Sequence, residues 1–120
     1  MPIQLALTYP ERIQTKTPDF IFDKNLTFLQ PKEDLFYLPT LAKDSIKQGK
    51  SASCVLNCAN EKAVELFLNK QIGFSDIQKL VKNVYENSEF TDIKSVADAK
   101  QIFADVVNKT ATDYKKILRI

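Results

Sequence analysis

The sequence predicts a mainly α protein, a small antiparallel four-helix bundle preceded by an irregular, proline-containing arm. All five prolines of the 120-residue chain fall within its first 39 residues. Each proline lacks a backbone donor and disfavours helix at the residue before it. From Leu38 onward, apolar residues recur at spacings of three and four, the pattern of amphipathic helices. Short breaks separate four such stretches, which favours antiparallel neighbours. We therefore expect an arm at residues 1–37 and a helical bundle domain at residues 38–120.

The arm carries many apolar side chains for a segment that has no core of its own. The run from Gln4 to Thr8 fits one turn of helix before Pro10. The run from Leu26 to Leu29 is β-prone and predicts an edge strand where a partner strand is offered. Further large apolar residues of the arm are Phe20, Ile21, Phe22, Leu35 and Phe36. We infer that the arm is built to lie against another surface.

The first two helices of the bundle are expected on either side of Gly49, which suits a C-terminal cap. Ser51 is placed to cap the second helix, which should end near Asn69. The apolar face of the first helix comprises Leu38, Leu41, Ala42, Ser45 and Ile46. That of the second comprises Ala52, Val55, Leu56, Ala59, Ala63, Leu66 and Phe67.

The last two helices each follow a capping signal. Ser75 and Gln78 match the S-x-x-Q capping box, which predicts a cost of ~1 kcal/mol for Ser75→Ala. Ser95 and Asp98 stand before the fourth helix, and Ile102 on its apolar face predicts ~2–5 kcal/mol for Ile102→Ala. The third apolar face comprises Ile77, Leu80, Val81 and Val84. The fourth comprises Ala99, Ile102, Phe103, Val106, Tyr114 and Ile117, with Lys115, Lys116 and Arg119 suiting the helix dipole at its end.

The composition excludes most catalytic classes. Histidine is absent, which removes the commonest general base and the commonest metal ligand. The two glycines are 24 residues apart in the sequence, so no G-x-G-x-x-G or Walker-type phosphate loop exists. Seventeen basic residues against fifteen acidic ones argue against nucleic-acid binding. No signal peptide and no apolar run of roughly 20 residues is present, so we expect no membrane partner and a cytoplasmic location.

Three constellations suggest chemistry, and each has a plainer interpretation. Two amides and a carboxylate lie on consecutive helical turns and could bind a polar ligand. Hydrogen bonds to nearby backbone groups and to solvent are the favoured interpretation of this set, which comprises Asn57, Asn60 and Glu61. An acidic set in the arm does not have the spacing of a calcium loop: Asp19, Asp23, Glu33 and Asp34. An aromatic and basic set is better explained as a mixed surface: Tyr85, Tyr114, Lys79, Lys82, Lys115 and Lys116.

The two cysteines, Cys54 and Cys58, share one helical face. A disulfide or a zinc site is disfavoured against two small, buried apolar side chains. The sequence therefore assigns no catalytic, cofactor-binding or metal-binding residue to this chain.

Several segments, read in order, resemble the 1-deoxy-D-xylulose 5-phosphate reductoisomerase family. PIQLALTYPERI is similar to that family's PIQYALTYPER-type stretch, and LTFLQPKEDLFYLPTLAKDSI to its LTF segment and following helix. VLNCANEKAVELFL resembles its VLNAANE helix, and GFSDI matches in register, so the match covers Pro2 to about Val81. Cys58 stands where an alanine is usual, and Leu5 lacks the usual aromatic.

The resemblance implies the linker and C-terminal helical domain of a larger enzyme. That enzyme would rearrange and reduce 1-deoxy-D-xylulose 5-phosphate to 2-C-methyl-D-erythritol 4-phosphate, a step of non-mevalonate isoprenoid biosynthesis. NADPH and a divalent metal, Mg or Mn, would be held by an NADPH-binding domain and a catalytic domain outside this chain, in a parent expected to be a homodimer. Because Met1 directly precedes the first matching residue, we expect a fragment.

Two functions from different classes therefore stay open. The first is structural support for the catalytic domain of the reductoisomerase, with no activity of the piece alone. The alternative is an independent helical adaptor that binds a partner helix or peptide, which would need an exposed apolar groove on the bundle. Four apolar stripes that cover one another leave little for such a groove, so the first hypothesis is preferred.

Overall fold

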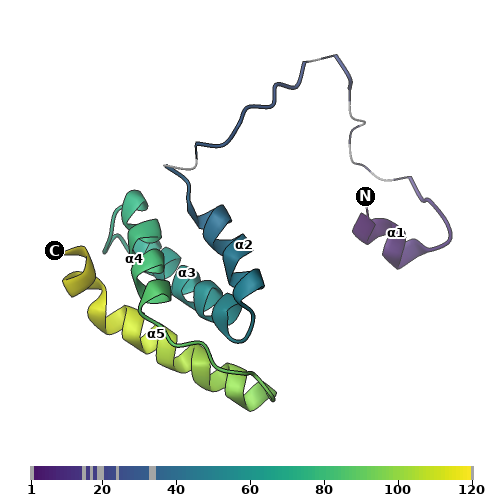
Figure 1. Cartoon of the computed structure of the whole chain (residues 1–120). Helices are drawn as coiled ribbons and strands as arrows, with labels where there is room; N and C mark the ends of the chain where they lie inside the picture. The colour runs from purple at the N-terminus through teal and green to yellow at the C-terminus, as the bar shows by residue number, and fades with distance from the viewer. Residues whose placement is uncertain are drawn as a thin grey trace. The chain divides into compact units, whose positions relative to one another are not determined.

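The computed structural model describes residues 2–14, 16, 18, 21–23, 25–32 and 35–119 (Figure 1). Within these ranges the chain is mainly helical, with five α-helices and no β-strand. It divides into two compact units, residues 1–30 and residues 31–120. Each unit is described by itself.

The first unit contains a short helix, α1 (Pro2–Thr8), which confirms the predicted helical turn before Pro10. Beyond α1 the chain folds back on it. The Gln4 side-chain amide donates to the Ile13 carbonyl at 2.7 Å, and the Thr8 hydroxyl donates to the Glu11 carbonyl at 2.7 Å.

The predicted strand in the arm is absent. Residues 25–32 have no regular secondary structure, because an edge strand needs a partner strand and no described segment provides one. Apolar side chains of the arm are exposed instead, with Phe22 at 92% and Phe28 at 88%. Phe20 lies outside the described residues.

The second unit contains four helices, α2 (Leu38–Gln48), α3 (Ala52–Leu68), α4 (Phe74–Glu86) and α5 (Val96–Leu118). Successive helices reverse direction, and α3 contacts each of the other three (Figure 1). The buried apolar core lies mainly between α3, α4 and α5, and comprises Ala52, Val55, Cys58, Ala59, Ala63, Leu66, Ile72, Leu80, Val81, Val84, Tyr85 and Val106. The helical bundle predicted from the apolar spacing is confirmed.

Two members of the predicted apolar faces are misassigned. Ile46 on α2 is 74% exposed and Phe103 on α5 is 44% exposed. Ile102 is only half-buried, and Val106 occupies the buried position of α5. Emptying the Ile102 site therefore removes less apolar surface from the core than the sequence suggests, so we expect Ile102→Ala to cost about 1–2 kcal/mol.

The helix ends follow local chemistry. Gly49 closes α2 with φ of 68°, in the left-handed region that glycine tolerates, and its amide donates to the Ser45 carbonyl at 3.2 Å. At the start of α5 the Ser95 hydroxyl accepts from the Asp98 amide at 3.1 Å, while the Asp98 carboxylate accepts from the Ser95 amide at 3.0 Å. A further backbone hydrogen bond from Lys94 is the largest cause of the lowered pKa of Asp98. Ser95 and Asp98, which the sequence places before the last apolar stripe, thus form the N-terminal cap of α5.

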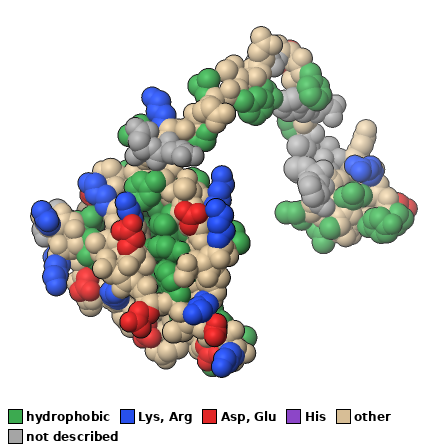
Figure 2. All heavy atoms as spheres, viewed as in Figure 1, with side chains coloured by type: hydrophobic (Ala, Val, Ile, Leu, Met, Phe, Trp, Pro, Cys, Tyr) green, Lys and Arg blue, Asp and Glu red, His purple; other side chains and the backbone are tan. Residues whose placement is uncertain are grey.

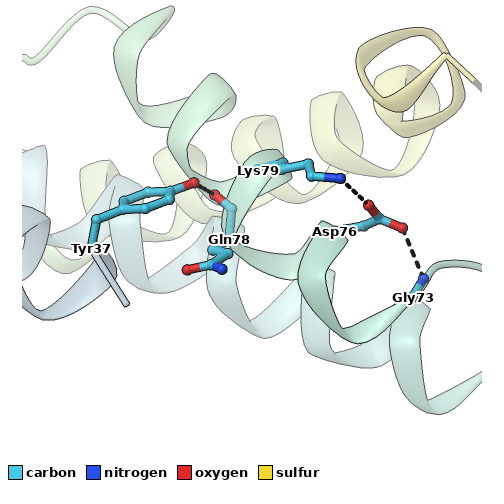
Figure 3. Close-up of polar contacts among 5 residues, drawn as sticks. All are labelled: Tyr37, Gly73, Asp76, Gln78 and Lys79. Carbon is cyan, nitrogen blue, oxygen red and sulfur yellow. Dashed lines mark hydrogen bonds and ion pairs between the residues drawn. The ribbon is translucent and has the colours of Figure 1, made fainter. Parts of the chain in front are cut away.

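The other two predicted caps differ in the structure. Ser51 does occupy the N-cap position of α3, but its hydroxyl accepts from the Thr91 amide at 3.0 Å and ties the loop before α5 to α3. The capping box at Ser75 and Gln78 is wrong, because α4 begins two residues earlier, at Phe74, with Gly73 as its N-cap. The Asp76 carboxylate accepts from the Gly73 amide at 3.1 Å and pairs with Lys79 at 2.9 Å (Figure 3).

The cap at Gly73 lowers the cost expected for Ser75→Ala and predicts a cost for Asp76→Ala. We expect Asp76→Ala to lower the free energy of unfolding by about 1 kcal/mol, because it removes the side chain that satisfies the first amide of α4. Ser75→Ala should change it by less than about 0.5 kcal/mol, since the exposed Ser75 makes no cap. Urea unfolding at neutral pH measures both, and a larger loss for Ser75→Ala would contradict the assignment.

The effect of Asp76→Ala should also depend on pH. The hydrogen bond from Lys79, followed by that from Gly73, lowers the pKa of Asp76 below its usual 3.8. A depressed folded-state pKa stabilises the fold above the unfolded value and loses that contribution as the pH falls through the folded value. The difference between the parent chain and Asp76→Ala should therefore shrink below about pH 3.8.

Candidate functional site

A groove of about 470 Å³ lies between α2 and α3. Residues on one face of each helix line it, because positions three or four apart in a helix point the same way. The apolar lining comprises Leu38, Pro39, Ala42, Ile46, Leu56 and Val81, and the polar lining comprises Ser45, Ser53, Asn57 and Asn60. None of these ten side chains carries a formal charge.

The polar lining of the groove is only partly engaged within the chain. The Ser45 hydroxyl donates to the Ala42 carbonyl at 2.8 Å and lies 3.1 Å from the Ser53 hydroxyl. The Asn57 amide donates to the exposed Glu61 carboxylate at 2.8 Å. The partner of Asn57 is thus the carboxylate one turn along, where the sequence allowed nearby backbone groups or a neighbouring loop. The structure brings Asn57 and Asn60 to the groove and leaves Glu61 at its outer edge.

A smaller recess of about 150 Å³ continues the groove past the start of α2. It shares Leu38 and Pro39 with the groove and adds Phe36, Phe74, Ile77 and Gln78. Phe36 is 55% exposed and Phe74 is 69% exposed. Apolar side chains are thus available to a partner along the whole length of α2, and Figure 2 shows apolar patches on the surface of this unit among its charged groups.

Tyr37 fixes the start of α2 against α4. Its hydroxyl donates to the Gln78 carbonyl, 41 residues along the chain (Figure 3). The Lys82 ammonium lies 5.2 Å from the centre of its ring, within the range of a cation–π contact. Burial, and then the charge of Glu86, raises the pKa of Tyr37. Sequence reasoning missed this anchor, because a tyrosine just before a helix has no periodic signal.

The cysteines do not form a disulfide. Cys54 and Cys58 are free, with 3.9 Å between their Sγ atoms. Burial, followed by the neighbouring Cys54, raises the pKa of the Cys58 thiol to about 12. The raised pKa disfavours the thiolate, which is the form that acts as nucleophile and metal ligand.

The acidic set of the arm falls mostly outside the described residues. Of the acidic set, Asp19, Glu33 and Asp34 lie outside the described residues, and Asp23 is exposed. Across the described ranges no group of three or more histidine, cysteine, aspartate or glutamate side chains could hold a metal ion. None of the described helices is long and apolar enough to cross a membrane.

The aromatic and basic set is divided between the core and the surface. Tyr85 is buried and packs on Phe90 at 5.0 Å between ring centres. Lys79 pairs with Asp76 at 2.9 Å and Lys82 approaches Glu86 at 3.8 Å. These basic groups therefore belong to a surface of mixed charge.

Comparison with known proteins gives one consistent family. The family described as DXP reductoisomerase C-terminal domain matches residues 1–109. The 1-deoxy-D-xylulose 5-phosphate reductoisomerase of Solibacter usitatus (strain Ellin6076) is 39% identical over 104 residues, which cover 85% of this chain and 26% of that protein. The enzyme of the same name from Heliobacterium modesticaldum (strain ATCC 51547 / Ice1) is 44% identical over 92 residues, 75% of this chain and 24% of that protein.

A solved structure supports the same relationship. The 1-deoxy-D-xylulose 5-phosphate reductoisomerase from Zymomonas mobilis in complex with NADPH aligns with a TM-score of 0.83 at 34% identity, over 95% of this chain and 31% of that chain. The chain thus spans about a quarter of the length of the curated relatives it matches and about a third of the solved one.

Proposed function

The chain belongs to the family of DXP reductoisomerase C-terminal domains, and on that premise we propose that it is the linker and helical support domain of a longer reductoisomerase. Residues 1–37 form the linker and residues 38–120 the C-terminal domain. The complete enzyme converts 1-deoxy-D-xylulose 5-phosphate to 2-C-methyl-D-erythritol 4-phosphate with NADPH and a divalent metal. The domains that bind NADPH, metal and substrate are the partners of this piece.

The observation that carries this proposal is the exposed apolar surface of the first unit. In the first unit the adjacent Phe28 and Leu29 are each at least 85% exposed, which a soluble monomer avoids in a contiguous segment. Relatives about four times as long supply a body of protein against which such surface can be buried. Burial of each large apolar side chain stabilises by about 1.5–3 kcal/mol, so a few such contacts suffice to dock the arm.

A supporting role without chemistry of its own follows from the side chains present. The sequence has no histidine and no glycine-rich phosphate loop, and the Cys58 thiol stays protonated at neutral pH. We place the enzyme in the cytoplasm, consistent with two free thiols one helical turn apart. Its assembly as a homodimer rests on the family resemblance.

The proposal is tested by removing the domain from the complete enzyme. We expect the intact enzyme to oxidise NADPH when given 1-deoxy-D-xylulose 5-phosphate and Mg²⁺, and the version without residues 38–119 to fall to the background rate. The isolated 120-residue chain should be inactive under the same conditions. Conversion of substrate by the isolated chain, or full activity of the truncated enzyme, would overturn the proposal.

An independent helical adaptor is the second candidate, and the groove between α2 and α3 favours it. The sequence had suggested that the four apolar stripes leave little room for a groove, whereas the structure shows one. The two candidates separate in the activity assay, because an adaptor would leave the rate of NADPH oxidation unaffected by its removal.

A further inference from the structure

We propose that the α2–α3 groove seats an uncharged polypeptide segment from the remaining domains of the same enzyme, with apolar side chains on its floor and backbone bonds to Asn57 and Asn60. The proposal rests on the proposed function, which supplies the remaining domains. It goes further by naming the face of the bundle that they contact and the chemistry of the segment.

The absence of charge in the groove selects the class of occupant. A phosphate, a nucleotide or an anionic lipid headgroup is held by arginine, lysine or a cluster of backbone amides. None of the ten lining residues is basic, and none is acidic. A charged occupant would lose its hydration without gaining a partner, which costs several kcal/mol. An uncharged segment of polypeptide avoids that cost.

The floor of the groove offers apolar area that the bundle does not use. Of its lining, Leu56 is only half-buried, whereas Val81 is a core residue with 0% exposure. Ile46 at the outer wall is 74% exposed, although it lies on the apolar face of α2. Seating apolar side chains here would cover Ile46 and Leu56 together, and would account for an isoleucine that the helical pattern places inward.

The rim supplies the groups that a peptide backbone needs. A carboxamide carries both donors and an acceptor, so it can pair with the N–H and C=O of one peptide unit. Asn60 is half-buried and makes no side-chain hydrogen bond to the described part of the chain, while Asn57 has only the exposed Glu61. One turn apart on α3, the two amides face the same strip of the groove.

The groove also has the length for a segment of several residues. It borders the recess at Phe36 and Phe74, with which it shares Leu38 and Pro39. That end of α2 is the point at which the chain arrives from residue 37, where Tyr37 is fixed to α4. A segment seated along α2 would therefore lie next to the linker itself.

Photocrosslinking in the complete enzyme tests the proposal. A benzophenone amino acid is placed at Ile46 in the groove, and a matched one at Lys100, which is exposed on α5 and does not line the groove. After irradiation, peptide mapping should show a crosslink from position 46 to an apolar segment of the enzyme's other domains. Position 100 should give no crosslink to that segment.

A thiol-protection experiment provides a second readout that does not depend on crosslinking yield. Ser53→Cys and the control Lys100→Cys are made in a background with Cys54→Ser and Cys58→Ala. Reaction of the groove thiol with N-ethylmaleimide should be about tenfold or more slower in the complete enzyme than in the isolated chain. In the complete enzyme the thiol reacts only in the fraction of molecules whose groove is not occupied by the segment. The control thiol should react equally fast in both.

The outcomes separate this proposal from the one on which it rests. An active enzyme whose groove thiol reacts as fast as in the isolated chain overturns the groove assignment and leaves the support function standing. A crosslink only to a second copy of this chain, or only to an unrelated protein, also overturns it. Loss of the support function would appear instead in the activity assay, with removal of residues 38–119 leaving the rate unchanged.

Discussion

Leu80→Ala should lower the free energy of unfolding by about 2–5 kcal/mol, the range for emptying a fully buried leucine site. Leu80 is 0% exposed on α4 and packs in the core between α3 and α5 with Val81 and Val84, which are equally buried. A unit of this size has a stability of roughly 5–15 kcal/mol in total. The substitution therefore removes a large share of it, and the melting temperature should fall on the order of 10 °C or more.

The matched control for this prediction is Leu68→Ala. Leu68 is the last residue of α3 and is 71% exposed, so the same chemical change removes little buried area. Its effect on urea unfolding should be below about 0.5 kcal/mol. Equal losses for the two variants would show that the core does not lie where α4 meets α3 and α5.

Most of the fold was predictable because helices are indicated by residues that lie close together in the sequence. The spacing of Leu80, Val81 and Val84 marks an inward face, and Gly49 and Ser95 mark helix ends through their own backbone and side-chain chemistry. The start of α4 was misplaced because both Gly73 and Ser75 can begin a helix. The choice between them is made by a carboxylate, Asp76, whose reach to the Gly73 amide has to be seen in three dimensions.

The helical spacing of apolar residues does not predict how wide a face of each helix is covered by its neighbours. Ile46 and Phe103 satisfy the helical pattern, yet both stay exposed, because the neighbouring helices cover only part of the apolar face. The strand expected at Leu26 to Leu29 fails for a related reason, since its hydrogen-bonding partner is not among the described residues.

The candidate site was harder to predict than the fold. The groove forms from α2 and α3 together, so its lining is scattered over Leu38 to Val81 and has no sequence motif. Asn57 and Asn60 were singled out, but as amides on a core helix their role could be weighed only once α2 was in place beside them.

Ala63→Leu is the second substitution with a large expected effect, because it adds volume where α3 is closest-packed. Ala52, Ala59 and Ala63 are all 0% exposed, and this line of small side chains lets neighbouring helices approach α3. Three added carbons at position 63 cannot be accommodated without moving a helix or forcing a side chain out of its preferred rotamer. Overpacking of this kind costs about 1–3 kcal/mol. Urea unfolding of the 120-residue chain measures the loss.

The control makes the same alanine-to-leucine change at a solvent-exposed position. Ala104 lies on α5 and is exposed, so Ala104→Leu adds the same three carbons to solvent and should change the free energy of unfolding by less than about 0.5 kcal/mol. Leucine and alanine are both strong helix formers, so helix propensity does not separate the two variants. If Ala63→Leu were as stable as Ala104→Leu, the space beside α3 would have to be open, and the small residues of that helix would need another explanation.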